Sequence, residues 1–273
     1  MKTKKNNVIR YILLIAGSLL TIGPLLWMII TSLKTYQETI AIPPTFLPKH
    51  YEWQNFVEVY NDFSFGNLFI NTFIVIFCVV IVQTFISLLA AYAFAKLDFP
   101  CKNILFVLLL SILMVPCQIF LIPQYNIIVG MKLSNTLLAL MIPSFFSVFS
   151  LFFFRQFLYG IPKSIDEAAK IDGASYFKIF FRIIIPLSKS AITSIGILTA
   201  LATWRNLMWP IIINRSINKM TLAAGLSFLI GEHTTYYQLV MAGGVISTIP
   251  IIIIFIFFQK HIVDGIATTG LKG

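Results

Sequence analysis

Six long apolar stretches constrain this chain more than any other feature of its sequence. Crossing about 30 Å of hydrocarbon takes roughly 20 helical residues, and each stretch is that long or nearly so. They lie near Tyr11–Leu33, Leu68–Ala95, Asn103–Ile122, Asn135–Phe154, Ser190–Ile213 and Tyr237–Phe258. They lack the alternation of barrel strands, and helices satisfy their own backbone in lipid. The sequence therefore predicts an all-α polytopic membrane protein with six transmembrane helices.

The distribution of basic residues predicts how these helices cross the membrane. The net charge of +10 alone would suggest nucleic acid or anionic lipid as a partner. However, fourteen of the 20 Lys and Arg residues lie before the first stretch, after the sixth, or in the second-to-third and fourth-to-fifth loops. Five lie in the other loops, and Arg205 falls inside the fifth stretch. The positive-inside rule places the basic side in the cytoplasm. We therefore expect cytoplasmic termini, a cytoplasmic loop at Ile161–Ser188, membrane lipid around the helices and no nucleic-acid partner.

The chain reads as one membrane domain without linkers or repeats. We expect a cytoplasmic N-terminus at residues 1–10, a transmembrane region at 11–258 and a cytoplasmic tail at 259–273. The first stretch is longer than a signal-peptide core and lacks a convincing A-x-A site, which favours a retained anchor. The apolar segment Met220–Gly231 is too short to span and is expected at the interface or within the fold. Prolines inside three stretches predict kinks or moving hinges: Pro24, Pro143 and Pro250.

Several kinds of chemistry are absent from the sequence. No G-x-x-x-x-G-K-[ST] motif occurs, so the chain has no P-loop for ATP. None of the six stretches contains Asp, Glu, Lys or His, which disfavours an ion-coupled secondary transporter. No H-E-x-x-H motif or nucleophile triad supports a membrane-embedded enzyme, and the three cysteines lack metal-site spacing. We therefore expect no catalytic residues and no metal, and an energy source outside this chain.

The loop Ile161–Ser188 is charged but carries apolar residues at helical spacing. Ser164 and Glu167 have the spacing of a capping box, which predicts a short helix ending near Asp172. Gly173 suits the left-handed turn after a helix, a second short helix is expected at Ser175–Arg182, and Pro186 suits the first turn of the fifth span.

Apolar side chains held outside a bilayer at helical spacing favour contact with another protein. In this loop they are Ile165, Ala168, Ala169, Ile171, Tyr176, Phe177, Ile179 and Phe180.

Three segments of the sequence resemble one protein family. The residues EAAKIDGAS (Glu167–Ser175), followed by Ile184-Ile185-Pro186, resemble the EAA loop of ABC importer permeases. The end of the chain, Gln259–Gly273, is similar to the closing motif of the carbohydrate branch. The segment from Trp204 to Pro210 resembles the family's W-N-x-[FL]-x-x-P pattern, although Arg205 stands where many members have Asn. The resemblance covers the whole chain and is to the maltose-transporter inner-subunit type.

The resemblance implies a type I ABC permease fold and a pore-forming subunit in the inner membrane of a bacterium. Its implied partners are a second homologous permease, two ATP-binding subunits that hold ATP and Mg, and an extracytoplasmic solute-binding protein. This chain would bind no cofactor. The implied substrate is a sugar or oligosaccharide, and another solute such as a glycerol phosphate is the alternative.

The EAA loop is implied to dock on the ATPase. The implied docking residues are Glu167, Ala168, Ala169, Asp172, Gly173, Ala174 and Pro186. Glu167 has two interpretations that are compatible with each other, because it can contact the ATPase or cap its own helix.

Sugar sites use aromatic faces and hydrogen-bonding side chains, so polar and aromatic residues in the spans are candidates for a substrate path. They are Asn71, Gln83, Gln118, Trp204, Arg205, Asn206 and Trp209. Helix packing is the favoured alternative for the amides and tryptophans. Arg205 has two open interpretations, since its side chain can snorkel outward or face the path.

Overall fold

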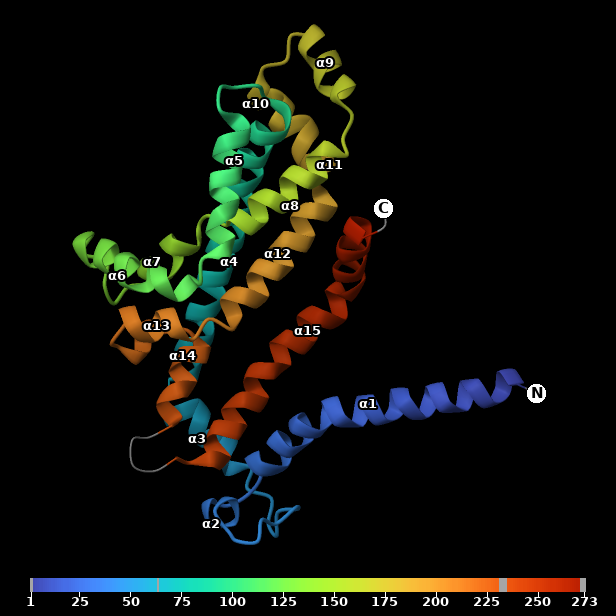
Figure 1. Ribbon diagram of the computed structural model, residues 1–273. Coiled ribbons are helices and arrows are strands. Elements are labelled where there is room, and N and C mark those ends of the chain that lie inside the picture. The colour runs from blue at the N-terminus through green and yellow to red at the C-terminus, as the bar shows by residue number, and fades with distance from the viewer. Residues whose placement is uncertain (1, 63, 231–234, 271–273) are drawn as a thin grey trace. The chain divides into compact units, whose positions relative to one another are not determined.

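The computed structural model describes residues 2–62, 64–230 and 235–270, with side chains described at 10–61, 64–230 and 235–257 (Figure 1). Within these ranges the chain is helical, and the β structure is confined to an isolated bridge between Ile230 and Thr235. Three helices are long and apolar enough to cross a membrane unbroken: Arg10–Ser32, Phe65–Lys96 and Tyr237–Phe257. Counting each of three bent helix pairs as one span gives six candidate spans, and the all-α polytopic prediction is confirmed.

The predicted third, fourth and fifth spans are wrong in detail, because none is one straight helix. Lys102–Met114 turns by 100° into Cys117–Gly130, and Leu137–Ser144 turns by 43° into Val148–Tyr159. Tyr176–Leu187 meets Lys189–Trp204 at 76°, and the predicted continuation to Ile213 is a separate helix, Met208–Ile213. A proline lies at or beside each bend, and proline lacks the N–H that a continuing helix needs. The length and mean hydropathy of an apolar stretch indicate a membrane span, but they do not reveal a break within it.

The chain divides into two compact units. The first comprises Met1–Gly66 and Gly225–Ile252, and the second comprises Asn67–Ala224 and Ile253–Gly273. The helices of the first unit are α1 (Lys2–Ser32), α2 (Tyr36–Thr39), α3 (Gln54–Asp62), η6 (Ser227–Leu229) and the first part of α15 (Tyr237–Gly270).

The C-terminal end of α1 is held by polar contacts within the first unit. The Asn55 amide nitrogen donates to the carbonyl oxygens of Ser32 and Lys34, each over 2.9 Å. The ammonium of Lys34 is buried, donates to the Thr45 carbonyl oxygen and lies 4.5 Å from the centre of the Trp27 ring. The bond to Ser32 satisfies one of the carbonyls that a helix end leaves without intrahelical partners.

Two glycines let α15 approach its neighbours closely. A Cβ added at Gly243 would lie 2.5 Å from Leu226 Cδ2, and one added at Gly244 would lie 2.9 Å from Met28 Sδ. Small residues at such contacts are typical of helix packing in membranes.

The second unit contains most of the helices. In chain order they are α4 (Phe65–Lys96), α5 (Lys102–Ser111), η1 (Ile112–Met114), η2 (Cys117–Phe120), α6 (Leu121–Gly130), α7 (Leu137–Met141), η3 (Ile142–Ser144), α8 (Val148–Tyr159), α9 (Lys163–Ile171), α10 (Tyr176–Ile179), the π-helical η4 (Phe180–Ile184), α11 (Ile185–Leu187), α12 (Lys189–Trp204), α13 (Met208–Ile213), η5 (Ile217–Lys219), the first part of α14 (Leu222–Leu226) and the last part of α15. The described part of the apolar segment, residues 220–230, contains α14 and η6, and its Leu222 and Leu229 are buried. Of the two expected placements, this burial favours the one within the fold.

The second unit has one buried cluster near the C-terminal end of α4 and another near the middle of that helix. One joins α4, α5, α8 and α12 to the loop 161–188 and includes Tyr92, Phe106, Phe154 and Phe180. The other joins α4 to α6, α7 and α13 around Trp209. Helix α4 therefore contributes buried residues to both clusters of this unit.

Candidate functional site

Helix α9 of the loop 161–188 begins differently from the prediction. Its N-cap is Pro162, which makes no side-chain cap hydrogen bond, and its first residue is Lys163. Ser164 therefore lies inside the helix, and the predicted capping box of Ser164 and Glu167 is wrong. Pro162 has an extended ψ of 137°, and helical backbone begins at the next residue, Lys163. Glu167 is exposed and does not take part in a capping box.

Helix α9 ends shortly before Gly173, as the sequence predicts. Gly173 has φ +76°. The Ala174 N–H donates to the Ala169 carbonyl over 2.9 Å, and the Gly173 N–H donates to the Lys170 carbonyl over 3.0 Å. These two bonds form a Schellman motif, which satisfies the last carbonyls of the helix and needs a left-handed residue at its centre.

The second helix of the loop is longer than predicted. Ser175 caps it, since its hydroxyl accepts from the Lys178 N–H over 3.3 Å. It then continues past Arg182 through a π-helical turn to Leu187, where Ser188 separates it from α12. Pro186 lies in α11 and cannot donate to the carbonyl four residues earlier. This accounts for the widened turn before it, so Pro186 precedes the bend instead of opening the straight fifth span.

The apolar residues of the loop divide into two sets. Ile171 and Phe177 are 87% and 68% exposed, and Ile165, Ala168 and Tyr176 are also exposed. The prediction that all eight face a partner is wrong for three, because Ala169, Ile179 and Phe180 are buried in the cluster with α4, α5, α8 and α12. The buried set fixes the loop to the chain, and the exposed set is available to another protein.

An ion pair joins the loop to α4. The Lys96 ammonium lies 2.9 Å from Asp166 Oδ2, and the two side chains are 3% and 11% exposed. The same ammonium donates to the Ile161 carbonyl oxygen over 2.8 Å. No local sequence signal connects Lys96 with Asp166, and the prediction missed this pair.

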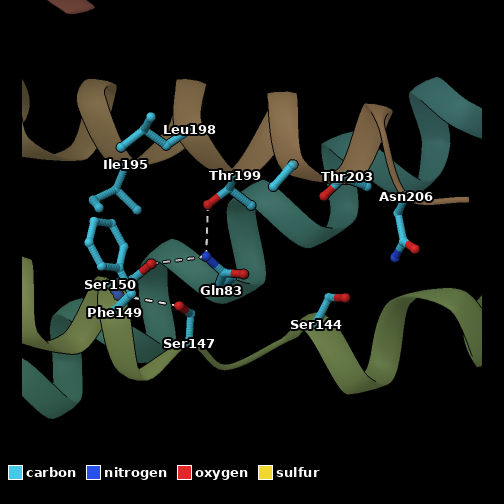
Figure 2. Close-up of a pocket in the computed structure, with 11 residues that line it drawn as sticks. Gln83, Ser144, Ser147, Phe149, Ser150, Ile195, Leu198, Thr199, Thr203 and Asn206 are labelled. Carbon is cyan, nitrogen blue, oxygen red and sulfur yellow. Dashed lines mark hydrogen bonds between the residues drawn. The ribbon is translucent and has the colours of Figure 1, made fainter. Parts of the chain in front are cut away.

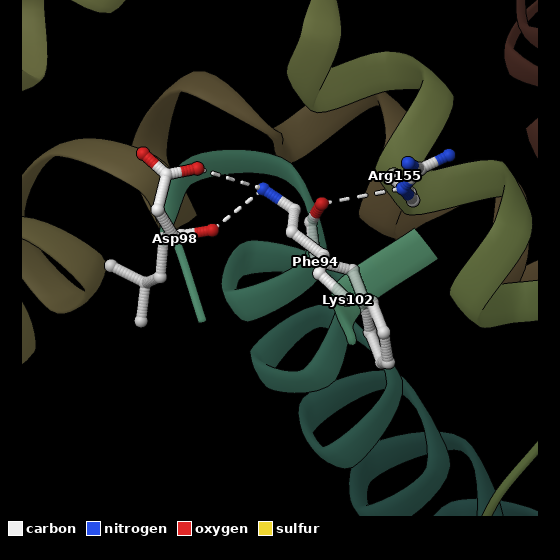
Figure 3. A network of polar contacts seen from close by, with 5 residues as sticks. Phe94, Asp98, Lys102 and Arg155 are labelled. Carbon is white, nitrogen blue, oxygen red and sulfur yellow. Dashed lines mark hydrogen bonds and ion pairs between the residues drawn. The ribbon is translucent and has the colours of Figure 1, made fainter. Parts of the chain in front are cut away.

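Basic residues at the same end of α4 also bond backbone carbonyls (Figure 3). Arg155 Nε donates to the Phe94 carbonyl over 3.3 Å, and its guanidinium lies 3.8 Å from the Phe106 ring centre. Lys102 Nζ donates to the Leu97 carbonyl over 2.6 Å and lies 3.5 Å from Asp98. Cations near the C-terminal end of a helix, here that of α4, interact favourably with its dipole. The basic residues that predict topology thus also stabilise this end of the unit.

A polar cleft of about 210 Å³ lies among α4, α8 and α12 (Figure 2). The Gln83 amide nitrogen donates to Ser150 Oγ over 3.1 Å and to Thr199 Oγ1 over 2.7 Å. Its carbonyl oxygen points away from both hydroxyls (Figure 2). The lining residues are Gln83, Ser144, Ser147, Phe149, Ser150, Ile195, Leu198, Thr199, Ala202, Thr203 and Asn206. Amides and hydroxyls predominate among them, and none carries a formal charge.

Of the predicted path residues, Gln83 and Asn206 line this cleft. Asn71 instead donates to the carbonyls of Asn218 and Met220, over 2.9 and 3.0 Å. Trp209 donates to the Ala139 carbonyl over 2.9 Å.

The other predicted path residues also lie outside the cleft lining. Trp204 packs edge-on against Phe73, with ring centres 5.7 Å apart. Arg205 is exposed and donates to the Leu201 carbonyl, and Gln118 is exposed on η2. The prediction missed the hydroxyls of the cleft. Their signal is a Ser at every third position, 144, 147 and 150, and a Thr four residues apart, at 199 and 203.

Comparisons with known proteins agree with this architecture. A family model described as the binding-protein-dependent transport system inner membrane component matches residues 83–268. The chain is 32% identical to the arabinooligosaccharides transport system permease protein AraQ of Halalkalibacterium halodurans, over 100% of both chains. It is 34% identical to AraQ of Bacillus subtilis, over 94% of this chain and 92% of the relative. It is 29% identical to the sn-glycerol-3-phosphate transport system permease protein UgpE of Yersinia pestis, over 95% of each.

A solved structure supports the fold. The crystal structure of a bacterial ABC transporter involved in the import of the acidic polysaccharide alginate matches with a TM-score of 0.82 and 21% identity. The match covers 95% of this chain and 97% of that one. The chain therefore belongs to the binding-protein-dependent transport system inner membrane component family, and it is a membrane-embedded permease subunit of an ABC importer.

Proposed function

We propose that this permease subunit imports an uncharged sugar or oligosaccharide. The observation that carries the proposal is the lining of the polar cleft, where Gln83, Thr199, Thr203 and Asn206 offer amides and hydroxyls without a formal charge. Such groups suit the hydroxyls of a sugar. The names of the two arabinooligosaccharide relatives support the same substrate class.

A glycerol phosphate is the alternative, and one relative carries that name. A phosphate dianion is usually held by Arg, Lys or several backbone N–H groups. No Lys, Arg or His lines the cleft among the described residues, and Arg205 beside it is exposed and bonds a backbone carbonyl. The lining therefore favours a neutral solute.

The loop 161–188 is the proposed docking element for an ATP-binding subunit. Exposed Ile165, Ala168, Ile171 and Phe177 offer apolar contact, and Glu167 offers a charge that no cap engages. The complete importer would contain a second permease, two ATP-binding subunits that hold ATP and Mg, and an extracytoplasmic solute-binding protein. Both termini and the loop would face the cytoplasm, as the basic residues favour.

Transport by the reconstituted importer tests the substrate. The chain is purified with its partner permease and ATP-binding subunits in proteoliposomes containing ATP, and the cognate binding protein is added outside with labelled solutes. We expect uptake of a neutral sugar or oligosaccharide, and no competition by glycerol phosphate. Uptake of the phosphate ester without uptake of any sugar would contradict the proposal.

Docking is tested separately by substitutions at Glu167. Glu167→Lys is expected to weaken co-purification of the ATP-binding subunit and to lower uptake. Glu167→Gln keeps the size of the side chain and tests the charge alone. If Glu167→Lys leaves co-purification and uptake unchanged, Glu167 is not a docking contact.

A further inference from the structure

Beside the apolar packing of Ala169, a buried ammonium group ties the docking helix α9 to α4. Lys96 is the last residue of α4, and its side chain is 3% exposed. Its Nζ contacts the Ile161 carbonyl, which precedes α9, and the Asp166 carboxylate in the first turn of α9. The Lys96 side chain therefore contacts both the residue before the docking helix and the first turn of that helix.

Asp166 differs from the other charged residues of α9. Lys163, Glu167 and Lys170 are exposed, whereas Asp166 turns inward on the face from which Ala169 enters the buried cluster. Both of its carboxylate oxygens are buried without a hydrogen-bond partner, so its contact with Lys96 is an ion pair. A buried ion pair adds little net stability, because removing two charges from water offsets their attraction. The pair is better explained by the defined position that it gives α9.

Helix α4 connects this pair with the polar cleft. It runs for 32 residues, and Gln83 lies about 20 Å from Lys96 along its axis, at 1.5 Å per residue. Gln83 in turn bonds Ser150 of α8 and Thr199 of α12. A displacement at the cytoplasmic end of α4 therefore reaches the hydrogen bonds of the cleft through one continuous helix.

We propose that Lys96 and Asp166 are a positioning pair that makes α9 and α4 move together. A pull by the ATP-binding subunit on the docking helix then reaches the cleft through α4. This inference rests on the proposed function, since it needs an ATP-binding subunit at α9. It adds a residue pair that contacts neither the docking partner nor the solute.

The test measures solute imported per ATP hydrolysed by the intact importer in proteoliposomes. Asp166→Asn removes the charge at nearly constant size, and we expect the ratio to fall at least about fivefold, the low end of typical coupling between sites. Asp98→Asn is the matched control, because Asp98 pairs with Lys102 at the same end of α4 but is 92% exposed (Figure 3). We expect the control to keep the wild-type ratio. A wild-type ratio in Asp166→Asn would overturn the inference.

Rescue distinguishes positioning from a general effect on folding. Lys96→Arg keeps the charge and the donors, and is expected to keep most of the ratio. Lys96→Gln keeps a donor for the Ile161 carbonyl but loses the charge, and is expected to resemble Asp166→Asn. A purely structural role would lower the amount of importer in the membrane at a constant ratio, and that result would also overturn the inference.

A paired apolar substitution tests the positioning role if the Asp166→Asn variant does not accumulate in the membrane. Lys96→Met with Asp166→Leu leaves no buried charge unpaired, and such replacements are often tolerated. A low ratio in this variant supports the inference, and a wild-type ratio overturns it. Failure of the proposed function is recognised separately, because the wild-type importer would then take up no sugar or retain no ATP-binding subunit.

Discussion

The backbone N–H of Ala174 donates to the Ala169 carbonyl over 2.9 Å, and this bond closes the turn between α9 and α10. The turn depends on Gly173 at φ +76°. A Cβ added at Gly173 would meet no atom within 4 Å. The position is therefore restricted by backbone conformation and not by space.

Gly173→Val is expected to distort this turn and abolish uptake while the protein still inserts. A left-handed conformation costs a residue with a side chain about 1–2 kcal/mol, and β-branching adds to that cost. Gly173→Asn is the control, because Asn adopts this conformation more readily, and it is expected to retain much of the activity. Membrane levels and uptake are measured together. Normal uptake by Gly173→Val at normal levels would show that the turn is not required.

The neighbouring alanines Ala168 and Ala169 are expected to respond differently to a bulky side chain. Ala168 is exposed, so Ala168→Trp should block the ATP-binding subunit without unfolding the permease. Ala169 is buried in the core cluster, so Ala169→Trp should destabilise the permease itself, by about 1–3 kcal/mol or more. Thermal unfolding in detergent and co-purification of the ATP-binding subunit separate the two effects. Equal loss of thermal stability in both variants would contradict this assignment.

Gln83→Leu is expected to lower sugar uptake without preventing assembly. The substitution removes the amide that bonds Ser150 and Thr199 and the carbonyl oxygen beside the cleft. Loss of one neutral hydrogen bond, at about 0.5–1.5 kcal/mol, corresponds to roughly two- to tenfold in uptake. The exposed Gln156 on α8 supplies a matched control, Gln156→Leu. Initial rates of uptake are compared at equal importer content, and equal rates in the two variants would exclude Gln83 from the path.

Single cysteines test the predicted topology. In a cysteine-free background, Ser164→Cys lies on the predicted cytoplasmic loop and Lys49→Cys on the first outer loop. A membrane-impermeant thiol reagent added to wall-stripped cells is expected to label Lys49→Cys, and to label Ser164→Cys after permeabilisation only. The reverse pattern would invert the topology that the basic residues predict.

The segment that follows α1 is expected to lose stability in acid. The backbone N–H groups of Lys49 and Thr35 bond the Glu38 carboxylate over 2.8 and 3.0 Å. These bonds hold the pKa of Glu38 below its ordinary value of 4.5. The carboxylate therefore contributes stability above the unfolded pKa, and this contribution is lost as the pH falls through the lower folded pKa.

Hydrogen exchange at the Lys49 amide measures this contribution. Protection relative to the intrinsic rate is expected to be higher in the wild type than in Glu38→Gln at neutral pH. The two should converge below pH 4.5. A constant difference across this range would show that Glu38 does not stabilise the segment through its charge.

Features that depend on neighbouring residues were predictable from the sequence. Gly173 was assigned correctly, because a left-handed helix end is a property of the local backbone. The number of spans also followed from length and apolarity. The start of α9 was assigned to Ser164 because its spacing to Glu167 is that of a capping box. The helix instead starts directly after Pro162. The proline and the capping-box serine lie only two residues apart, and the sequence alone does not show which of them marks the helix start.

Features that depend on tertiary packing were not predictable in the same way. Ala168 and Ala169 have identical side chains, and only the packing of α9 decides which one is buried. Lys96 and Asp166 lie on separate helices, so neither helix carries a local signal for the pair. Gln83 was singled out with Asn71 and Trp209 because all are polar or aromatic residues in apolar spans. Their different partners depend on how the spans pack.

The bend after α5 sets a requirement on the lipid. The straight part before the 100° turn consists of ten residues of α5 and three of η1, which span about 20 Å. This length is well short of a hydrocarbon core of about 30 Å. With the bent pair crossing as one span, the bilayer would thin beside α5 or another protein surface would cover the difference, and each such mismatch has an energetic cost. The activity of the importer is thus expected to depend on acyl-chain length, with shorter chains matching this helix best.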